Sequence, residues 1–354
     1  MPLSASRILR GAVRWASEPS HVWLFVFLPA LVSFLEALQR RGESFATLGH
    51  VEVLLDNAKL AIPAGEKFAV LDTGHRNASA VASVEYDDAP HVLFTDAGVQ
   101  RFYKWEKGSG SLTVGRSLFM EKRVAKHLLS NFMKGVLVTT SAETPDLTFL
   151  YENGTVRSVS LQSVAEEHSL EPGPIGGIVF GPKKNLFFSF ENDGRGRVFR
   201  IKKIRLQQML RAGAEIAVDV VVEVGASLRG LATDGEYLAA ASAESLFAVD
   251  LDTKKVSRIC DAGPFEKPGF TTVAMDKSGL IWAAHGSGVD IAGPIGAEAR
   301  PSDAEDQEDP PASTSPYVLV GRALTGIPIT GVACAQSGYL YLTTATQLLR
   351  LKVM

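Results

Sequence analysis

The sequence contains few cysteines and has little excess charge. Two cysteines, Cys260 and Cys334, occur in 354 residues, with no CxxC pair and no histidine at metal-ligand spacing. This count argues against a disulfide scaffold and against a structural zinc site, and we expect both thiols to be buried and free. The net charge of −3 at pH 7 provides no basic excess for nucleic acid, so we expect no nucleic-acid partner.

The common catalytic motifs are missing as well. No GxSxG, HExxH or Walker sequence occurs, and no glycine-rich dinucleotide fingerprint follows a strand. Gly194-Arg-Gly196 is typical of a hairpin turn rather than a phosphate loop, and the adjacent acids Asp87 and Asp88 suit a solvated turn. The motifs therefore predict no cofactor.

The N-terminal 42 residues differ from the rest of the chain. Residues 1–17 contain three arginines and no acid, which is typical of a mitochondrial transit peptide and also of the basic start of a secretory signal. Residues 18–42 include an apolar run from His21 to Leu38. Eighteen helical residues extend about 27 Å, close to a hydrocarbon core of about 30 Å.

Three interpretations of the apolar run remain open: a single transmembrane helix, a cleaved secretory signal, and a helix buried against protein. We favour the transmembrane anchor, in an inner mitochondrial membrane, with the endoplasmic reticulum or another secretory membrane as the alternative. The anchoring side chains would be Trp23, Phe25, Phe27, Leu31 and Phe34. Two glycosylation sequons, at Asn77 and Asn153, would matter only in a secretory lumen.

A phrase of two short strands joined by a Ser-Gly turn occurs twice near the C-terminus. Residues 271–285 read Thr-Thr-Val-Ala-Met-Asp-Lys-Ser-Gly-Leu-Ile-Trp-Ala-Ala-His, and residues 330–344 read Thr-Gly-Val-Ala-Cys-Ala-Gln-Ser-Gly-Tyr-Leu-Tyr-Leu-Thr-Thr. Equivalent positions in six copies are Ala80, Gly135, Gly177, Gly230, Thr272 and Gly331. Their spacings are 55, 42, 53, 42 and 59 residues, and about 42 residues suit one four-stranded propeller blade.

The repeats predict an all-β, six-bladed β-propeller over residues 80–354, preceded by the N-terminal hydrophobic helix. Residues 43–79 would form a linker, and Val51–Leu55 or Phe68–Leu71 could supply a strand that closes the ring. The longer spacings require insertions. These are a short helix within residues 121–133, a basic outer strand or helix at 200–211, and a disordered acidic loop at 301–316.

The segment Pro268-Gly-Phe-Thr-Thr-Val-Ala-Met-Asp-Lys-Ser-Gly-Leu-Ile-Trp-Ala-Ala-His285 resembles a blade of the senescence-marker-protein/gluconolactonase propellers. Residues 91–103, His-Val-Leu-Phe-Thr-Asp-Ala-Gly-Val-Gln-Arg-Phe-Tyr, look like a blade of the strictosidine-synthase-like and NHL-repeat propellers. The resemblance implies a divalent cation at one tunnel mouth, held by carboxylate and amide side chains. The matching positions here are Ser79 or Ala80, Gly176, Arg229 and Thr271. None is a carboxylate, which argues against a bound metal and leaves enzymatic activity uncertain.

Two cations replace the expected ligands. Lys134 and Arg229 each precede a glycine that would begin an inner strand, so they would lie at the same tunnel mouth and could bind a small anionic ligand. Thr271, Thr330 and His285 would also reach this mouth, although we favour a position within the blade for His285.

The combined features predict a membrane-anchored binding or scaffold module rather than an enzyme. The N-terminal helix would attach it to the membrane, where it would serve as an accessory subunit with protein partners in a mitochondrial membrane complex. The alternative function is a metal-dependent lactonase or esterase-type hydrolase, as the family resemblance implies.

Overall fold

The computed structural model describes residues 46–54, 62, 65–84, 91–99, 101–106, 110–113, 125–133, 136–151, 153–212, 216–262, 269–294, 315–335 and 338–353. The chain separates into two units at Phe45 and Ala46, and the account below concerns the second unit alone. The predicted transit peptide and anchor, Lys134 and most of the acidic loop lie outside the described residues. No helix within the described residues has the length and apolar character needed to cross a membrane.

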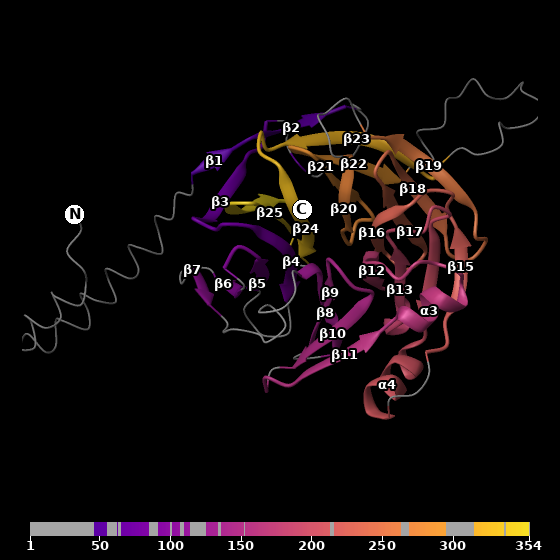
Figure 1. Cartoon of the computed structure of the whole chain (residues 1–354). Helices are drawn as coiled ribbons and strands as arrows, with labels where there is room; N and C mark the ends of the chain where they lie inside the picture. The colour runs from indigo at the N-terminus through magenta and orange to yellow at the C-terminus, as the bar shows by residue number, and fades with distance from the viewer. Residues whose placement is uncertain are drawn as a thin grey trace, which may run out of the picture. The chain divides into compact units, whose positions relative to one another are not determined.

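Six antiparallel sheets surround a central axis, which confirms the six-bladed propeller (Figure 1). The first blade contains β4 (Ala78–Val84), β5 (His91–Asp96), β6 (Arg101–Glu106) and β7 (Gly110–Thr113). The second contains β8 (Ala125–Met133), β9 (Val136–Ser141), β10 (Asp146–Tyr151) and β11 (Val156–Ser160). The third contains β12 (Ile175–Phe180), β13 (Leu186–Phe190), β14 (Arg197–Ile201) and β15 (Asp219–Glu223).

The remaining blades follow the same order from the axis outward. The fourth contains β16 (Leu228–Thr233), β17 (Tyr237–Ser242), β18 (Ser245–Asp250) and β19 (Val256–Asp261). The fifth contains β20 (Phe270–Met275), β21 (Ile281–His285), β22 (Gly288–Pro294) and β23 (Tyr317–Leu324). The sixth contains β24 (Ile329–Ala335), β25 (Tyr339–Thr344) and β26 (Gln347–Lys352). The helical segments described are α3 (Gln162–Glu167), the 3₁₀ turn η2 (Pro182–Lys184) and α4 (Lys203–Ala212).

An N-terminal strand completes the last blade. Strand β3 (Phe68–Thr73) pairs with β26, and β1 (Thr47–Leu48) adds to the outside of β3. Strand β2 (His50–Val53) pairs instead with β23 in the fifth blade. The two segments considered for ring closure therefore extend different blades, and β3 joins the beginning of the propeller to its end. This union of distant parts of the chain covers an edge that would otherwise be exposed.

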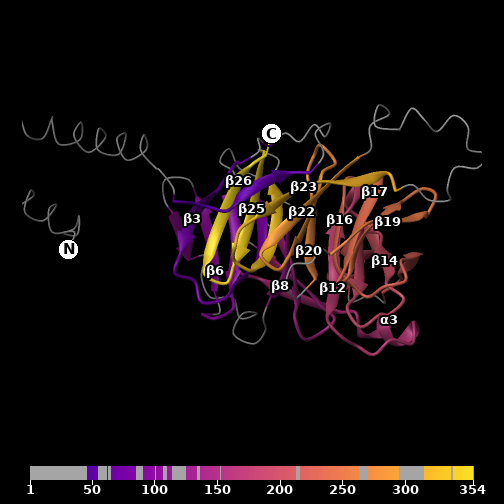
Figure 2. The ribbon, with the colours of Figure 1, turned by 90° about the horizontal axis from the view of Figure 1, so that it is seen from above.

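The second strand of each blade lies between two neighbouring sheets and is correspondingly apolar. All five residues of β13 and of β21 are buried, whereas β11 and β15 at the rim are largely exposed. Strands buried on both faces are expected to lack polar alternation. Figure 2 shows the blades from the side, with strands running between the two ends of the propeller.

The Ser-Gly turn of the repeated phrase has a direct structural basis. Asp276 accepts hydrogen bonds from the backbone N–H groups of Ser278 (2.9 Å) and Leu280 (3.0 Å), and from the indole Nε1 of Trp282 (3.0 Å). Gly279 has a φ of +82°, which favours glycine. Trp282 is fully buried. The turn therefore joins β20 to β21 while satisfying the polar atom of the largest buried side chain of that blade.

The predicted helix within residues 121–133 is wrong. Residues 125–133 form β8, the innermost strand of the second blade, paired with β9. Val124, Leu128 and Phe132 have helical spacing, but pairing with β9 and neighbouring inner strands overrides that local pattern. The second blade thus begins at Ala125 instead of Gly135. The basic segment at 200–211, for which strand and helix were both considered, ends β14 and then forms α4.

Candidate functional site

Every inner strand is irregular at the same position near one end. The register between each inner strand and its neighbour shifts by one residue there, which is the signature of a β-bulge, and in β4 the bulge includes Ala80 as well as Ser79. The residues at the six bulges are Ser79, Lys126, Gly176, Arg229, Thr271 and Thr330. Because inner strands start at the same end of the propeller, we call these six residues the mouth ring.

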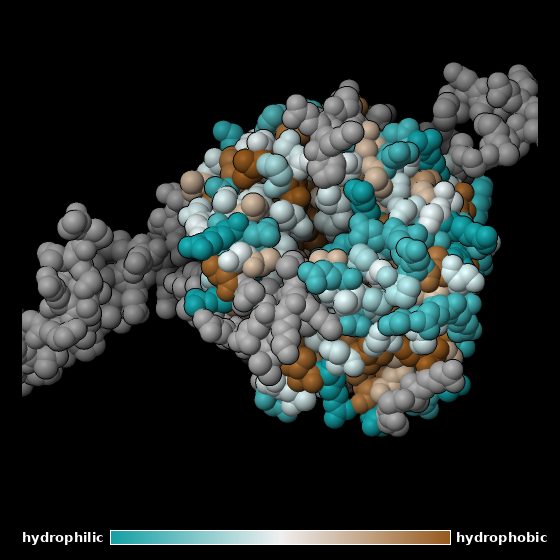
Figure 3. All heavy atoms as spheres, in the orientation of Figure 1, coloured by the Kyte–Doolittle hydropathy of each residue, from teal (hydrophilic) through white to brown (hydrophobic). Residues whose placement is uncertain are grey.

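The mouth ring lies at one end of a central cavity of about 350 Å³, whose walls come from all six inner strands. Its middle section is mostly apolar and includes Val81, Val179, Val273 and Val332. Figure 3 shows hydrophobic side chains down a hollow near the centre of this face. The cavity is large enough for a small ligand, although an apolar wall alone does not define one.

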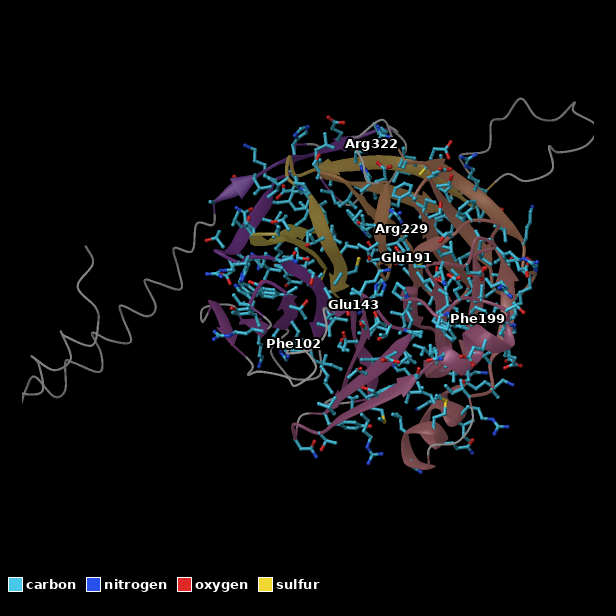
Figure 4. The ribbon with its side chains drawn as sticks, viewed as in Figure 1. Phe102, Glu143, Glu191, Phe199, Arg229 and Arg322 are labelled. Carbon is cyan, nitrogen blue, oxygen red and sulfur yellow. The ribbon has the colours of Figure 1, made fainter. Side chains whose placement is uncertain are left out.

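Lys126 and Arg229 are the cations of the mouth ring. The Lys126 Nζ lies 2.6 Å from the Glu191 Oε2, and Glu191 directly follows β13 of the intervening third blade. Burial lowers the pKa of Lys126, Glu191 opposes that effect, and the nearby Arg229 contributes further lowering. Figure 4 shows Glu191 and Arg229 beside each other near the centre of the ring. Among the described residues, no carboxylate forms an ion pair with Arg229.

Gly176 occupies the mouth ring between these two cations. A Cβ atom at this position would overlap the carbonyl oxygen of Leu228 and lie 3.1 Å from the Cα of Glu191. The absence of a side chain lets β12 approach β16 closely and leaves Glu191 space beside Lys126. The third blade therefore contributes backbone and a carboxylate from its loop, rather than a side chain from its inner strand.

His127 lies next to Lys126 on the cavity wall. Its Nε2 is 3.0 Å from the carbonyl oxygen of Gly176, which requires the Nε2–H tautomer and connects β8 to β12. Burial and the neighbouring Lys126 charge lower the pKa of His127 to about 3, so the ring is neutral at pH 7. It is a fixed hydrogen-bond donor rather than a third cation.

The hydroxyl groups of the mouth ring mainly bind the scaffold. The Thr330 hydroxyl donates to the Ala78 carbonyl at 2.7 Å, and the Thr271 hydroxyl donates to the Ala284 carbonyl at 3.3 Å. Ser79 Oγ lies 2.9 Å from Thr95 Oγ1. These contacts tie strands together, so the hydroxyl groups of Thr271 and Thr330 are used within the scaffold.

His285 is placed differently from the other predicted residues. It ends β21, the second strand from the axis, and not an inner strand. Its side chain is buried, contacts Phe270 edge-on at 5.7 Å, and lies 3.3 Å from the carboxylate of Asp290. Arg322 pairs with the same carboxylate at 2.8 Å. His285 thus belongs to a charged cluster inside the fifth blade.

The sequence-based alignment missed Lys126 and His127, because it began the second blade at Gly135. It also missed Glu191, which lies in a loop of the third blade. Lys134 lies two positions before the start of β9, the second strand, and its own placement lies outside the described residues. A usable signal was present in the second strands. Thr140 and Ser141 of β9 pair with His127 and Ala125, on either side of Lys126. Ala241 and Ser242 of β17 pair in the same way with residues on either side of Arg229, so matching the two second strands aligns Lys126 with Arg229.

The residues do not fit the metal implied by the family resemblance. The described residues contain no group of three or more histidine, cysteine, aspartate or glutamate side chains able to hold a metal ion. In the mouth ring, two positions carry positive charge, and the nearby Glu191 already pairs with Lys126. Like charge would repel a divalent cation at this position.

Cys260 and Cys334 are both free, and each is partly rather than fully buried. Cys334 lines the central cavity, which explains its partial exposure. Desolvation nevertheless raises the pKa of the Cys260 thiol to about 12 and that of the Cys334 thiol well above its usual value. Neither is suited to act as a thiolate.

Comparisons with known proteins show solved structures of similar fold. No family model and no curated protein matches the sequence. A gluconolactonase from Xanthomonas campestris superposes with a TM-score of 0.61 at 11% identity, covering 87% of this chain and 97% of that chain. The calcium-binding protein regucalcin from Agrobacterium tumefaciens gives a TM-score of 0.50 at 14% identity, covering 80% and 92%. The fold is that of these propellers.

A streptogramin B lyase is also similar, with a TM-score of 0.50, 12% identity, and coverage of 81% of this chain and 98% of the lyase. Identities this low establish a shared architecture and leave activity undetermined. The gluconolactonase-like propeller is thus shown here as a fold, while the mouth ring supplies the chemical evidence specific to this chain.

Proposed function

We propose that this gluconolactonase-like propeller binds a small anionic molecule at its mouth ring, without a metal ion. The observation that carries the proposal is the presence of Lys126 and Arg229 at two of the six equivalent bulges. Lys126 lines a cavity of about 350 Å³, and the equivalent bulge position of Arg229 places it at the same end of the propeller. A carboxylate or phosphate group is the ligand chemistry that such a pair recognises.

The two cations have different roles. Lys126 is already held by Glu191 at 2.6 Å, so an incoming anion must share that lysine with a protein carboxylate. Arg229 has no such partner among the described residues and provides the main charge for the ligand. His127 holds the backbone between the two blades and keeps its proton donor directed at Gly176.

The proposal is tested by calorimetric titration with inorganic phosphate and with D-gluconate. A charge-assisted hydrogen bond contributes about 1.5–3 kcal/mol, so Arg229→Gln should weaken binding by about 10- to 100-fold. Arg195→Gln is the matched control, because Arg195 is exposed on a loop of the third blade at the same end of the propeller. Equal affinity in wild type and Arg229→Gln, or equal losses in both variants, would overturn the assignment.

A second candidate function is hydrolysis of a lactone, which the similarity to a gluconolactonase favours. It predicts turnover of glucono-δ-lactone that depends on an added divalent cation and disappears with chelator. Such turnover would refute the metal-independent site proposed above. The hypotheses of a membrane anchor, a mitochondrial location and an accessory role in a membrane complex depend on residues 1–42 and remain predictions.

A further inference from the structure

Helix α4 is firmly attached to the propeller along one side. Leu206, Met209 and Leu210 are buried in the core beneath the second and third blades. Arg157 of β11 donates a hydrogen bond to the carbonyl oxygen of Leu210. The helix is therefore a fixed part of the fold, and the orientation of its outer side is determined.

The outer side combines one apolar residue with several cations. Ile204 is 63% exposed, more than any other exposed large hydrophobic residue among those described. Arg205, Gln208 and Arg211 are exposed around it, and Gln208 and Arg211 lie four and seven positions further along the same helical face. We call Lys202, Lys203, Ile204, Arg205, Gln208 and Arg211 the α4 surface.

The positive charge of the α4 surface is largely uncompensated. No acidic residue occurs in the sequence between Asp193 and Glu215. Asp219 lies 2.8 Å from Arg200 and 4.0 Å from Lys202, so it is already shared. Within the described residues, no ion pair neutralises Lys203, Arg205 or Arg211.

The strand directions place α4 away from the mouth ring. Strand β12 begins at the mouth ring, β13 runs antiparallel to it, and β14 therefore runs in the direction of β12. Helix α4 follows β14 directly, at the end of the blade opposite Arg229. A partner on the α4 surface would leave the ligand site accessible.

We propose that the α4 surface docks on an anionic lipid bilayer, with Ile204 entering the interface and the surrounding cations facing the headgroups. A convex helix with a single apolar side chain offers no groove for a peptide, whereas a flat bilayer can receive that side chain and neutralise the charges around it. Clusters of basic side chains at a protein surface are attracted to the negative potential of anionic lipid headgroups.

The test is co-sedimentation of the full chain with vesicles of phosphatidylcholine containing 30% phosphatidylserine, and with pure phosphatidylcholine vesicles. The double variant Lys203→Glu/Arg205→Glu should reduce partitioning onto the anionic vesicles by at least about tenfold. Lys254→Glu/Lys255→Glu is the matched control, because both lysines are exposed on a β18–β19 turn at the same end of the fourth blade. This control should change partitioning by less than about twofold.

Two further measurements distinguish binding of the α4 surface to a lipid bilayer from binding to another partner. Ile204→Ser should weaken binding to anionic vesicles while leaving the far-ultraviolet circular dichroism and thermal unfolding unchanged. Binding to the pure phosphatidylcholine vesicles should be the same for wild type and all variants, because residues 21–38 are common to them. Equal losses in both double variants, or tighter binding of wild type to soluble poly-glutamate than to the anionic vesicles, would overturn the proposal.

Discussion

Protonation of His127 offers a quantitative test of the cavity wall. The folded protein holds the pKa of this histidine at about 3, below the reference value of 6.5. The folded state therefore binds fewer protons than the unfolded chain between those values. The free energy of unfolding is therefore undiminished by His127 above pH 6.5. It falls progressively as the pH drops from 6.5 toward 3, because the unfolded chain takes up the proton first.

The magnitude follows from the same pKa values. Each pKa unit corresponds to about 1.4 kcal/mol, so the full displacement from 6.5 to about 3 limits the effect to about 5 kcal/mol. At pH 4.5 the limit is about 2.7 kcal/mol. Because His127 is partly exposed to the cavity, water can screen its charge, and we expect about 1–2 kcal/mol at that pH.

The assay compares urea unfolding of wild type and His127→Gln at pH 7 and pH 4.5. Glutamine retains a neutral donor for the Gly176 carbonyl but cannot take up a proton in this range. The free energy of unfolding should fall by about 1–2 kcal/mol more in wild type than in the variant. His50→Gln is the control, since the His50 side chain is 49% exposed at the rim. Parallel losses in wild type and His127→Gln would refute the reasoning, as would a proton resonance of His127 that titrates near pH 6.5.

Two further substitutions test the packing that forms the mouth ring and closes the propeller. Gly176→Ala should lower the free energy of unfolding by about 1–3 kcal/mol, because the new Cβ would overlap the Leu228 carbonyl oxygen. Gly194→Ala is the control, since a Cβ at Gly194 meets no atom within 4 Å. It should change the free energy of unfolding by less than about 0.5 kcal/mol. Equal urea midpoints for these two variants would contradict the close approach of β12 to β16. Phe68→Ala should cost about 3–5 kcal/mol, because Phe68 is fully buried in the closing strand β3. A loss below about 1 kcal/mol in urea unfolding would show that β3 contributes little to closure.

The architecture was predictable because each blade repeats its own local pattern. The Asp276–Gly279 turn, the apolar second strands and the spacing of the copies all depend on neighbours within about forty residues. The error in the second blade has a physical cause. Residues 125–133 show helical spacing in isolation, and only the pairing with β9 and the packing around the axis select a strand.

The candidate site was less predictable. Arg229 was identified from the sequence, whereas its true counterpart is Lys126 rather than Lys134, because the alignment started from a glycine instead of the bulge. Glu191 carries no motif of its own. Its importance arises from a loop that brings it within 2.6 Å of a lysine 65 positions away.

The sequence by itself therefore determined the all-β class and the sixfold repetition. These properties follow from turn chemistry, strand periodicity and residue identity, which are local. Only the tertiary structure decided which strand is innermost in the second blade, which N-terminal segment closes the ring, and which charges meet at the mouth. Those outcomes depend on contacts between segments far apart in the chain, and such contacts leave no regular period in the sequence.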